Sequence, residues 1–214
     1  MKKNICMNDL FFAKVRPNAI IPTKDEENAG RDVYACFDED YMVIQSHETK
    51  LIPTGIASAI TPKYEIRLRD RGSNGSKGIH VNAGTIDSGY RGEWFVAWCN
   101  TNCEDVILSK LTKEELIEKY GKEDLDGDLF IPINVNEPMT KNKYGYYEGR
   151  NNALLIKSDE EIFNIDYIFY PYSKAIAQAE VCEVPVMNQY EITYEELKEI
   201  PSNRGVGALG STGK

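Results

Sequence analysis

The sequence contains no long apolar run, and no stretch approaches the roughly 18 to 20 consecutive apolar residues that a membrane-spanning helix needs. The opening segment, residues 1–9, contains two lysines but then turns polar, so it lacks the apolar core of a secretory signal peptide. We therefore expect a soluble, cytoplasmic protein with no membrane partner.

Basic charge is also scarce. The chain has 25 Lys and Arg residues against 34 Asp and Glu residues, which gives a net charge of −9 at pH 7. Proteins that bind polyanions without sequence preference follow the phosphate backbone with an excess of Lys and Arg. We therefore expect no nucleic-acid partner, although a single nucleotide neutralised by a metal ion is compatible with this composition.

Cysteine and histidine are too few and too scattered to form a metal centre. The five cysteines are odd in number and contain no pair of CxxC motifs, so neither a zinc site nor a disulfide framework is indicated. His47 and His80 are far apart and lack the spacing of metal ligands. Reduced thiols in an intracellular protein are the simplest interpretation.

Short strand patterns dominate residues 9–102. Tyr64–Arg69 alternates apolar and charged residues, which is the period of a strand with one buried face. Leu51–Ile60 and Trp94–Cys99 are apolar runs of strand length between turn-forming residues. Without helical periodicity between these strands, the pattern predicts an all-β sandwich, jelly roll or barrel. A chain of 214 residues favours one domain, which we place at residues 1–201.

Residues 104–168 have a different character. Thr112 and Glu115 form a capping-box pattern, and Leu116, Ile117 and Tyr120 then fall on one face of a short helix. Residues 124–150 are polar and show little periodicity, so this region is predicted to be an insertion with loops and a hairpin. Strand-like composition returns at residues 165–170 and 176–186, and Thr193-Tyr-Glu-Glu196 opens a second short helix.

Two glycine-rich regions carry the candidate chemistry. Arg71–Gly78 and Asn82–Gly92 offer amide, hydroxyl and guanidinium donors, which suit a phosphate chain, although simple turns would have the same composition. The tail at residues 202–214 contains four glycines, and Ser211 stands where a P-loop requires lysine, which excludes that motif. Such a tail is either disordered or a lid that closes over a bound phosphate.

Five segments in one order resemble the five motifs of the homotrimeric dUTPase family. They are Ala29-Gly-Arg-Asp-Val33, Arg71-Gly-Ser73, Gly84-Thr-Ile-Asp-Ser-Gly-Tyr-Arg-Gly92, Ile176-Ala-Gln178 and Arg204–Gly213. The resemblance covers residues 10–102 and 172–214, with an insertion between the third and fourth motifs as in some phage-type members. It implies a β jelly roll, a homotrimer, and Mg²⁺-dependent hydrolysis of dUTP to dUMP and pyrophosphate. In the family this reaction keeps uracil out of DNA and supplies dUMP for dTMP synthesis.

The resemblance also implies roles around the base and sugar. Asp87 matches the catalytic aspartate that deprotonates the water attacking the α-phosphorus. Tyr90 matches the tyrosine that lies under the deoxyribose and leaves no room for a 2′-hydroxyl. The hairpin from Gly84 through Ile86 to Tyr90 matches the one that recognises uracil through backbone groups.

Further roles are implied around the phosphates. Arg71 and Ser73 match the pair that binds them, but Gly72 intervenes, so either the Ser73 hydroxyl or the Gly72 backbone takes this role. Gln178 matches the fourth-motif glutamine, and Asp32 matches an aspartate near the metal, which it would reach through water. The remaining matches lie in the predicted lid at residues 202–214, where Leu209 replaces a common aromatic residue; they are Arg204, Ser211 and Thr212.

Three alternatives stay open at this stage. A dCTP deaminase of the same fold would release ammonia instead of pyrophosphate. The insertion at residues 104–168 could instead act as a surface for a protein partner, alone or alongside catalysis. A catalytically silent relative is the third, which the joint presence of Asp87, Tyr90, Gln178 and Arg204 argues against.

Overall fold

The structure is a computed structural model that describes residues 5–6, 8–120, 122–123, 129–132, 140–141, 147–148, 163–164 and 167–202. Four predicted site residues of the tail lie outside the described residues: Arg204, Leu209, Ser211 and Thr212. Contacts along the chain divide it into two compact units, Met1–Val184 and Pro185–Lys214.

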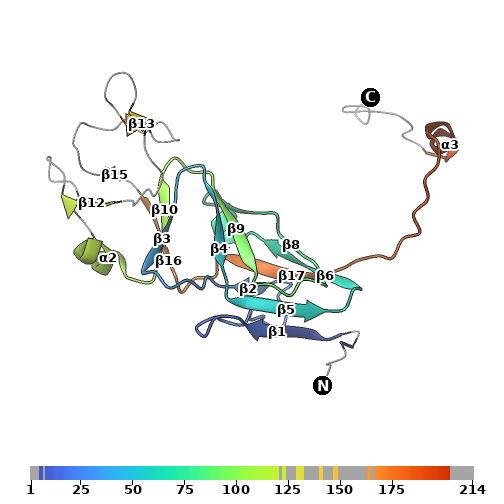
Figure 1. Cartoon of the computed structure of the whole chain (residues 1–214), viewed down its shortest axis with the longest axis horizontal. Helices are drawn as coiled ribbons and strands as arrows, with labels where there is room; N and C mark the ends of the chain where they lie inside the picture. The colour runs from blue at the N-terminus through green and yellow to red at the C-terminus, as the bar shows by residue number, and fades with distance from the viewer. Residues whose placement is uncertain are drawn as a thin grey trace. The chain divides into compact units, whose positions relative to one another are not determined.

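In the described part of the first unit, strands are the main regular structure and helices are few, which confirms the all-β prediction (Figure 1). Its principal strands are β1 (Leu10–Lys14), β2 (Arg31–Val33), β3 (Tyr41–Ile44), β4 (Thr49–Pro53), β5 (Ile56–Ile60), β6 (Tyr64–Arg69), β7 (Ile79–Asn82), β8 (Thr85–Ile86), β9 (Phe95–Asn100), β10 (Asp105–Ser109), β16 (Tyr167–Pro171) and β17 (Ala177–Glu183).

The strands form small sheets with mostly antiparallel pairing. The largest has the order β2-β17-β6-β8, two others have the orders β4-β9-β7 and β16-β10-β3, and β1 pairs with β5. Among these pairs β10 and β16 run parallel, since Asp105 lies opposite Tyr167 and Ser109 opposite Pro171. The chain therefore leaves the sheet after β10 and re-enters it in the same direction at β16.

The predicted strand at residues 51–60 is in fact two strands, β4 and β5. The break lies at Thr54 and Gly55, where the backbone of Gly55 has φ +68°. A side chain here would adopt a strained conformation, and a Cβ atom would lie 3.0 Å from the Cys36 sulfur. The reversal of direction thus depends on a glycine inside an apolar run, which a strand pattern does not reveal.

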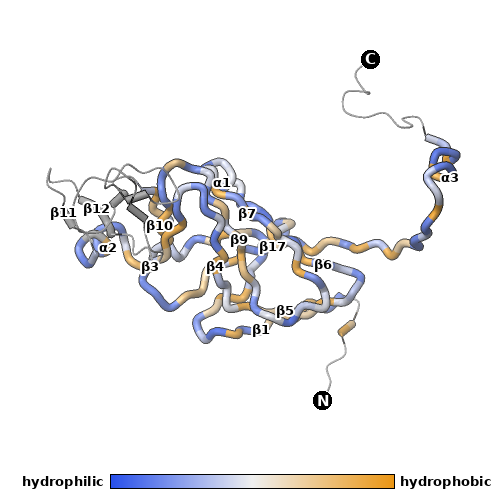
Figure 2. Tube along the Cα trace, turned by 45° about the horizontal axis from the view of Figure 1, so that its top comes forward, coloured by the Kyte–Doolittle hydropathy of each residue, from blue (hydrophilic) through white to orange (hydrophobic). Residues whose placement is uncertain are grey.

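One hydrophobic core lies between the sheets. Trp94, Trp98, Ile52 and Val33 are fully buried in it, and the Trp98 ring meets Tyr170 edge to face at 5.0 Å. Val106 and Leu108 of β10 belong to the same core, although they fall within the range predicted for the insertion. Figure 2 shows hydrophobic and hydrophilic residues mixed along these strands.

Helix α2 (Lys113–Tyr120) confirms the first capping box. The Glu115 amide donates to the Thr112 hydroxyl at 3.2 Å, and the Thr112 amide donates to the Glu115 carboxylate at 2.8 Å. Leu116 is fully buried in a second, smaller cluster with Ile107 of β10. The helix therefore covers the face of the β16-β10-β3 sheet that points away from the main core.

Short strands follow α2, and they bear out the predicted hairpin. They are β11 (Lys122–Glu123), β12 (Leu129–Pro132), β13 (Thr140–Lys141), β14 (Tyr147–Glu148) and β15 (Phe163–Asn164). Strands β13 and β14 pair antiparallel, with Thr140 opposite Glu148.

The second unit contains one described helix, α3 (Tyr194–Glu199). Its predicted capping box is present, because the Glu196 amide donates to the Thr193 hydroxyl at 3.2 Å and the Glu196 carboxylate accepts from the Thr193 amide at 2.8 Å. An apolar stretch precedes the helix (Figure 2), and within it Val186 and Met187 are exposed. No helix in the described part of the chain is long and apolar enough to span a membrane.

Candidate functional site

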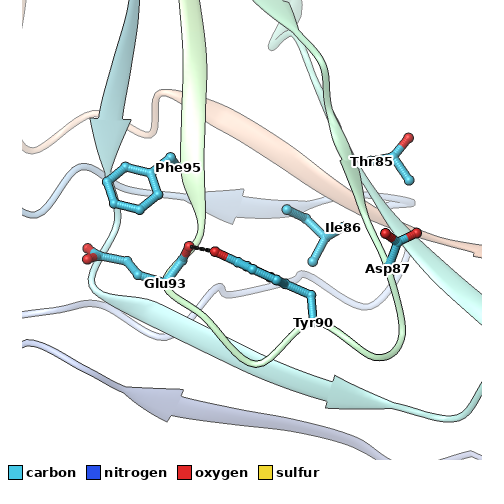
Figure 3. A pocket seen from close by; sticks show the side chains of 6 residues that line it. All are labelled: Thr85, Ile86, Asp87, Tyr90, Glu93 and Phe95. Carbon is cyan, nitrogen blue, oxygen red and sulfur yellow. Dashed lines mark hydrogen bonds between the residues drawn. The ribbon is translucent and has the colours of Figure 1, made fainter.

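An open pocket forms where β8 ends and the chain turns toward β9 (Figure 3). Its volume is about 210 Å³, and it is lined by Thr85, Ile86, Asp87, Tyr90, Glu93 and Phe95. Residues from the third predicted motif therefore share one cavity. Glu93 and Phe95, which the prediction did not include, complete its wall.

Gly84 determines how closely this segment approaches the sheet. Its carbonyl accepts a 2.7 Å hydrogen bond from the Leu68 amide, and a Cβ atom on Gly84 would overlap the Leu68 carbonyl oxygen. Only glycine permits this approach. The preceding residue, Ala83, has φ +48°, so the backbone is strained at the point where the pocket begins.

Asp87 and Tyr90 lie at the two ends of a tight turn. The Tyr90 amide donates to the Asp87 carbonyl at 3.0 Å, and both side chains are exposed. The exposed Asp87 carboxylate is accessible to water and ligand alike. Figure 3 shows the Tyr90 ring extending from this turn toward Glu93.

The Tyr90 ring is fixed along its length. Its hydroxyl donates a 2.9 Å hydrogen bond to the Glu93 carbonyl, and the ring lies against Gly92, where a Cβ atom would overlap the tyrosine. Arg91 holds the turn itself, because its guanidinium donates to the carbonyls of Ser88 at 2.6 Å and Tyr90 at 2.8 Å. These contacts hold the Tyr90 ring in one position in the pocket.

A second group of predicted residues converges at another edge of the same sheet. Arg71 Nε lies 3.3 Å from Asp32 Oδ1, and the Gln178 amide donates to the same oxygen at 3.3 Å. Arg71 also donates to the Ala175 carbonyl at 3.3 Å. Three segments predicted as the first, second and fourth motifs therefore meet at one carboxylate.

A helical turn, α1 (Gly72–Gly75), follows Arg71 directly. The Asn74 and Gly75 amides both donate to the Arg71 carbonyl, which leaves the Gly72 and Ser73 amides as the first of the turn, without a partner inside it. Both residues are exposed, and a Cβ atom at Gly72 would meet nothing within 4 Å. Backbone donors and the Ser73 hydroxyl are therefore open to an anionic ligand.

Asn74 and Tyr170 support this turn from below, and sequence reasoning missed both. The buried Asn74 amide donates to the Ile176 carbonyl at 3.1 Å, and its oxygen accepts from the Tyr170 hydroxyl at 2.9 Å. Burial raises the pKa of Tyr170, so its hydroxyl stays a donor. The sequence signal that could have identified Asn74 is an asparagine inside a glycine-rich turn.

Asp70 fixes the entry to the turn. Its carboxylate accepts a 2.5 Å hydrogen bond from the Val81 amide and lies 3.0 Å from His80 Nδ1, both on β7. His80 thus has a packing role in the described structure. The backbone immediately before Arg71 is anchored to β7.

The two groups of site residues are far apart within one copy. Ile86 pairs with Ile66 near the start of β6, and Asp87 continues toward that end, whereas Arg71 follows the other end. Five residues separate Ile66 from Arg71, about 16 Å of extended chain. Asp32 and Thr85 also lie on opposite edges of the β2-β17-β6-β8 sheet, three strand spacings or about 14 Å apart.

Metal-binding groups are sparse in the part of the chain that the structure describes, where no three Asp, Glu, His or Cys side chains converge. Asp32 is one carboxylate, and its Oδ1 already faces Arg71 and Gln178. Mg²⁺ commonly binds through one or two carboxylates together with substrate phosphates and water. The donor set therefore fits a magnesium ion that nucleotide phosphates help to hold.

Comparison with known proteins is consistent across sequence and structure. The family model described as dUTPase matches residues 16–113. A deoxyuridine 5'-triphosphate nucleotidohydrolase from Leptospira interrogans is 34% identical over 103 residues, which cover 46% of this chain and 70% of that protein. The protein of the same name from Rickettsia bellii is 36% identical over 119 residues, covering 53% and 75%.

Solved structures of phage dUTPases share the fold. The dUTPase of Staphylococcus bacteriophage 80alpha with dUPNHPP matches with a TM-score of 0.57 at 20% identity, covering 97% of this chain and 99% of that one. A mutant dUTPase from phage phi11 of S. aureus, solved with a structural Mg(II) ion, matches with a TM-score of 0.53 at 18% identity, covering 88% and 99%. With relatives above 30% identity aligned over more than two thirds of their length, this chain belongs to the dUTPase family.

Proposed function

We propose that this protein hydrolyses dUTP to dUMP and pyrophosphate by attack of water on the α-phosphorus. The observation that carries the proposal is the pocket that Thr85, Ile86, Asp87 and Tyr90 line together. Relatives named deoxyuridine 5'-triphosphate nucleotidohydrolase, at 34% and 36% identity, support the same substrate.

Asp87 is the catalytic base in this proposal. Its exposed carboxylate at the pocket rim would accept a proton from water, whose oxygen then bonds to the α-phosphorus. The bond between the α-phosphorus and the oxygen that bridges to the β-phosphorus breaks, and pyrophosphate leaves. A carboxylate can do this only within hydrogen-bond range of the water, so its position at the end of β8 is what matters.

Tyr90 and the backbone from Gly84 to Ile86 would select the nucleoside. A ring whose tip lies against Gly92 would leave space for a deoxyribose and would clash with a 2′-hydroxyl. The backbone that begins at the strained Ala83 would present amide and carbonyl groups to uracil, and in this proposal it would also exclude a 5-methyl group. Rejection of the wrong base follows from buried polar groups left unpaired.

The phosphates would be bound by the group that Arg71 forms with Asp32, Gln178 and the α1 turn, which we call the Arg71 group. Arg71 supplies a planar guanidinium, and α1 supplies the Gly72 and Ser73 donors. Asp32 pairs with Arg71, and Gln178 donates to the same Asp32 oxygen. We also propose that Arg204, Ser211 and Thr212 grip the terminal phosphates as a lid. Leu209 would leave such a lid without ring stacking on uracil.

Ile66, which pairs with Ile86 beside Asp87, is separated from Arg71 by about 16 Å of extended chain, so we infer that one copy does not bring Asp87 to a phosphate held by its own Arg71. We therefore propose a homotrimer in which each site combines the Asp87 pocket of one copy with the Arg71 group of another. Closed rings of three copies use such repeated unlike contacts. The separation of the groups supports shared sites.

Mg²⁺ is the proposed cofactor. When bound, it would neutralise charge on the triphosphate and help pyrophosphate to leave. Asp32 is the residue proposed to reach it, through a water molecule, while the phosphates supply most ligands. We also propose that the protein works in the cytoplasm, consistent with five cysteines that show no disulfide pattern.

The direct test compares pyrophosphate release from dUTP, UTP, dTTP and dCTP with and without a chelator. We expect turnover of dUTP alone, its loss with the chelator and its recovery with added Mg²⁺. Ammonia release from dCTP would instead identify a deaminase of the same fold. Equal turnover of UTP or dTTP would contradict the role given to the pocket.

Protein binding by residues 104–168 stays a prediction, because much of this segment lies outside the described residues. A variant that lacks residues 121–166 but retains β10, α2 and β16 tests it. Unchanged capture of proteins from a host or phage lysate would remove its support.

A further inference from the structure

A charged pair lies directly behind the pocket, between the chain after β1 and the start of β9. Arg16 Nε donates to Glu93 Oε1 at 2.9 Å, and a second guanidinium nitrogen of Arg16 lies 3.4 Å from Glu93 Oε2. Glu93 Oε1 also accepts a 2.8 Å hydrogen bond from the Gly55 amide. Three segments distant in sequence are therefore joined at one carboxylate.

This carboxylate belongs to the residue that holds Tyr90. The Glu93 backbone carbonyl accepts the Tyr90 hydroxyl at 2.9 Å, so the position of Glu93 sets the position of the ring (Figure 3). The next residue cannot move, since the Trp94 amide donates to Ile56 at 2.7 Å and the Trp94 carbonyl accepts from Thr54. Glu93 thus connects a fixed strand to an exposed turn.

The pair is partly shielded from water, which gives it more weight than a surface ion pair. The Glu93 side chain is 16% exposed and Arg16 is 35% exposed. The hydrogen bond that Arg16 donates to Glu93 raises the pKa of Arg16, so the guanidinium stays charged. Bidentate contact between arginine and a carboxylate also restricts orientation as well as distance.

Gly55 adds a second restraint. Its backbone has φ +68°, a Cβ atom there would overlap Ala19, and its amide donates to Glu93 Oε1 at 2.8 Å. Arg16 is held nearby, because the Val15 amide donates to the Gly55 carbonyl at 2.8 Å. The anchors of Glu93 are therefore rigid, and rigid anchors are what a positioned binding group needs.

We propose that Arg16 and Glu93 are positioning residues for sugar selectivity, which act through the Tyr90 hydroxyl to hold the ring where it excludes a 2′-hydroxyl. The inference rests on the proposed hydrolysis of dUTP and names two residues that determine its discrimination against UTP. Neither side chain is required to touch the nucleotide.

The test measures kcat/KM for dUTP and for UTP in the intact oligomer. Arg16→Met should lower the ratio of kcat/KM for dUTP to kcat/KM for UTP by about tenfold. Displacing a positioned group by a fraction of an ångström changes rates on this scale. KM for dUTP should rise while kcat changes little, because Asp87 is left in place. Arg16→Lys keeps the charge without the planar fork and should give an intermediate ratio.

Two comparisons separate positioning from general stability. Lys119→Met removes another ion pair, with Asp40, on the sheet covered by α2, and should leave the ratio unchanged. In a Tyr90→Phe background, which lacks the hydroxyl, Arg16→Met should have little further effect on the ratio. Independent, additive effects of the two substitutions would overturn the proposed route through Tyr90.

The outcomes are distinguishable. No hydrolysis of dUTP by the natural sequence overturns the proposed function and this inference together. Selective hydrolysis of dUTP with an unchanged ratio in Arg16→Met, or an equal fall for both nucleotides, overturns this inference alone. Should Arg16→Met fail to fold, a natural ratio in Arg16→Lys overturns it as well.

Discussion

The side-chain amide of Gln178 donates a 3.3 Å hydrogen bond to the carboxylate of Asp32, although 146 positions separate the two residues. Strand pairing explains the contact, because Gln178 of β17 lies directly opposite Asp32 of β2. Arg71 reaches the same oxygen from the end of β6. The group formed by Asp32, Arg71 and Gln178 is therefore a product of sheet register, with Asp32 as the residue that the other two contact.

Substitution of Asp32 tests this arrangement. In Asp32→Asn, Arg71 loses its charged partner, and Gln178 loses a hydrogen bond to a charged group, which contributes about 1.5–3 kcal/mol. We therefore expect KM for dUTP to rise about tenfold or more. Steady-state kinetics measure the change. The matched control is Glu180→Gln, which breaks the ion pair with Arg69 on the same sheet. An equal effect in both variants would contradict a specific role for Asp32.

Gly84→Ala should destabilise the protein strongly. The new methyl group would overlap the Leu68 carbonyl oxygen, and backbone cannot move aside as a flexible side chain can. We expect a loss of about 3 kcal/mol or more, at the upper end of overpacking effects, seen as a lower urea midpoint. Gly89→Ala is the control, since a Cβ atom there meets nothing within 4 Å. Similar midpoints for both variants would refute the close approach.

The packing of α2 should depend on pH through Asp40. Its carboxylate accepts from Lys119 at 2.5 Å and from Tyr120 at 2.7 Å, and these bonds, that from Lys119 first, lower the pKa of Asp40 below its ordinary 3.8. Because the pKa of Asp40 is lower in the folded protein, the contact stabilises the fold above about pH 3.8. This stabilisation is lost as the pH falls through the pKa of Asp40 in the folded protein.

The bond to Asp40 also raises the pKa of Lys119 above 10.5, so the same contribution disappears in strong alkali. We expect Asp40→Asn to lower Tm by the same amount from about pH 5 to pH 9, and by progressively less below about pH 4. The control is Asp38→Asn, which changes an exposed aspartate near Asp40 in the sequence. A difference in Tm that persists in acid would contradict the assigned contact.

Mixed oligomers test the sharing of sites. Asp87→Asn and Arg71→Met should each be inactive alone, whereas co-folding them in equal amounts should restore about a quarter of the sites, the statistical share for repeated unlike contacts. Pyrophosphate release reports recovery. Recovery requires that Asp87 and Arg71 of one site come from different copies, so no recovery in well-folded mixtures would place both in one chain.

Local patterns predicted much of this fold. The alternation in Tyr64–Arg69 identified β6 with its observed ends, and both capping boxes marked real helices at α2 and α3. These features depend on side chains a few residues apart, so they are visible in sequence. Motif resemblance likewise placed Asp32, Arg71 and Gln178 in one set, and the structure brings them together.

Long-range features could not be predicted in this way. The parallel pairing of β10 with β16 depends on where the chain returns to the sheet after the long segment between them. The sequence of either strand alone does not identify its partner. Asn74 and Glu93 act through contacts with Tyr170 and Arg16 that lie 96 and 77 positions away. The split of residues 51–60 into two strands follows from a positive φ at Gly55 inside an apolar run.

The central claim is that Asp87 activates water for hydrolysis of dUTP, and pyrophosphate release by the natural sequence and by Asp87→Asn tests it most directly. We predict selective turnover of dUTP by the natural sequence and a fall in kcat of about 10²-fold to 10⁴-fold in Asp87→Asn, with binding of a non-hydrolysable dUTP analogue retained. Turnover by a well-folded Asp87→Asn protein at the natural rate, or none by the natural sequence, would contradict the account.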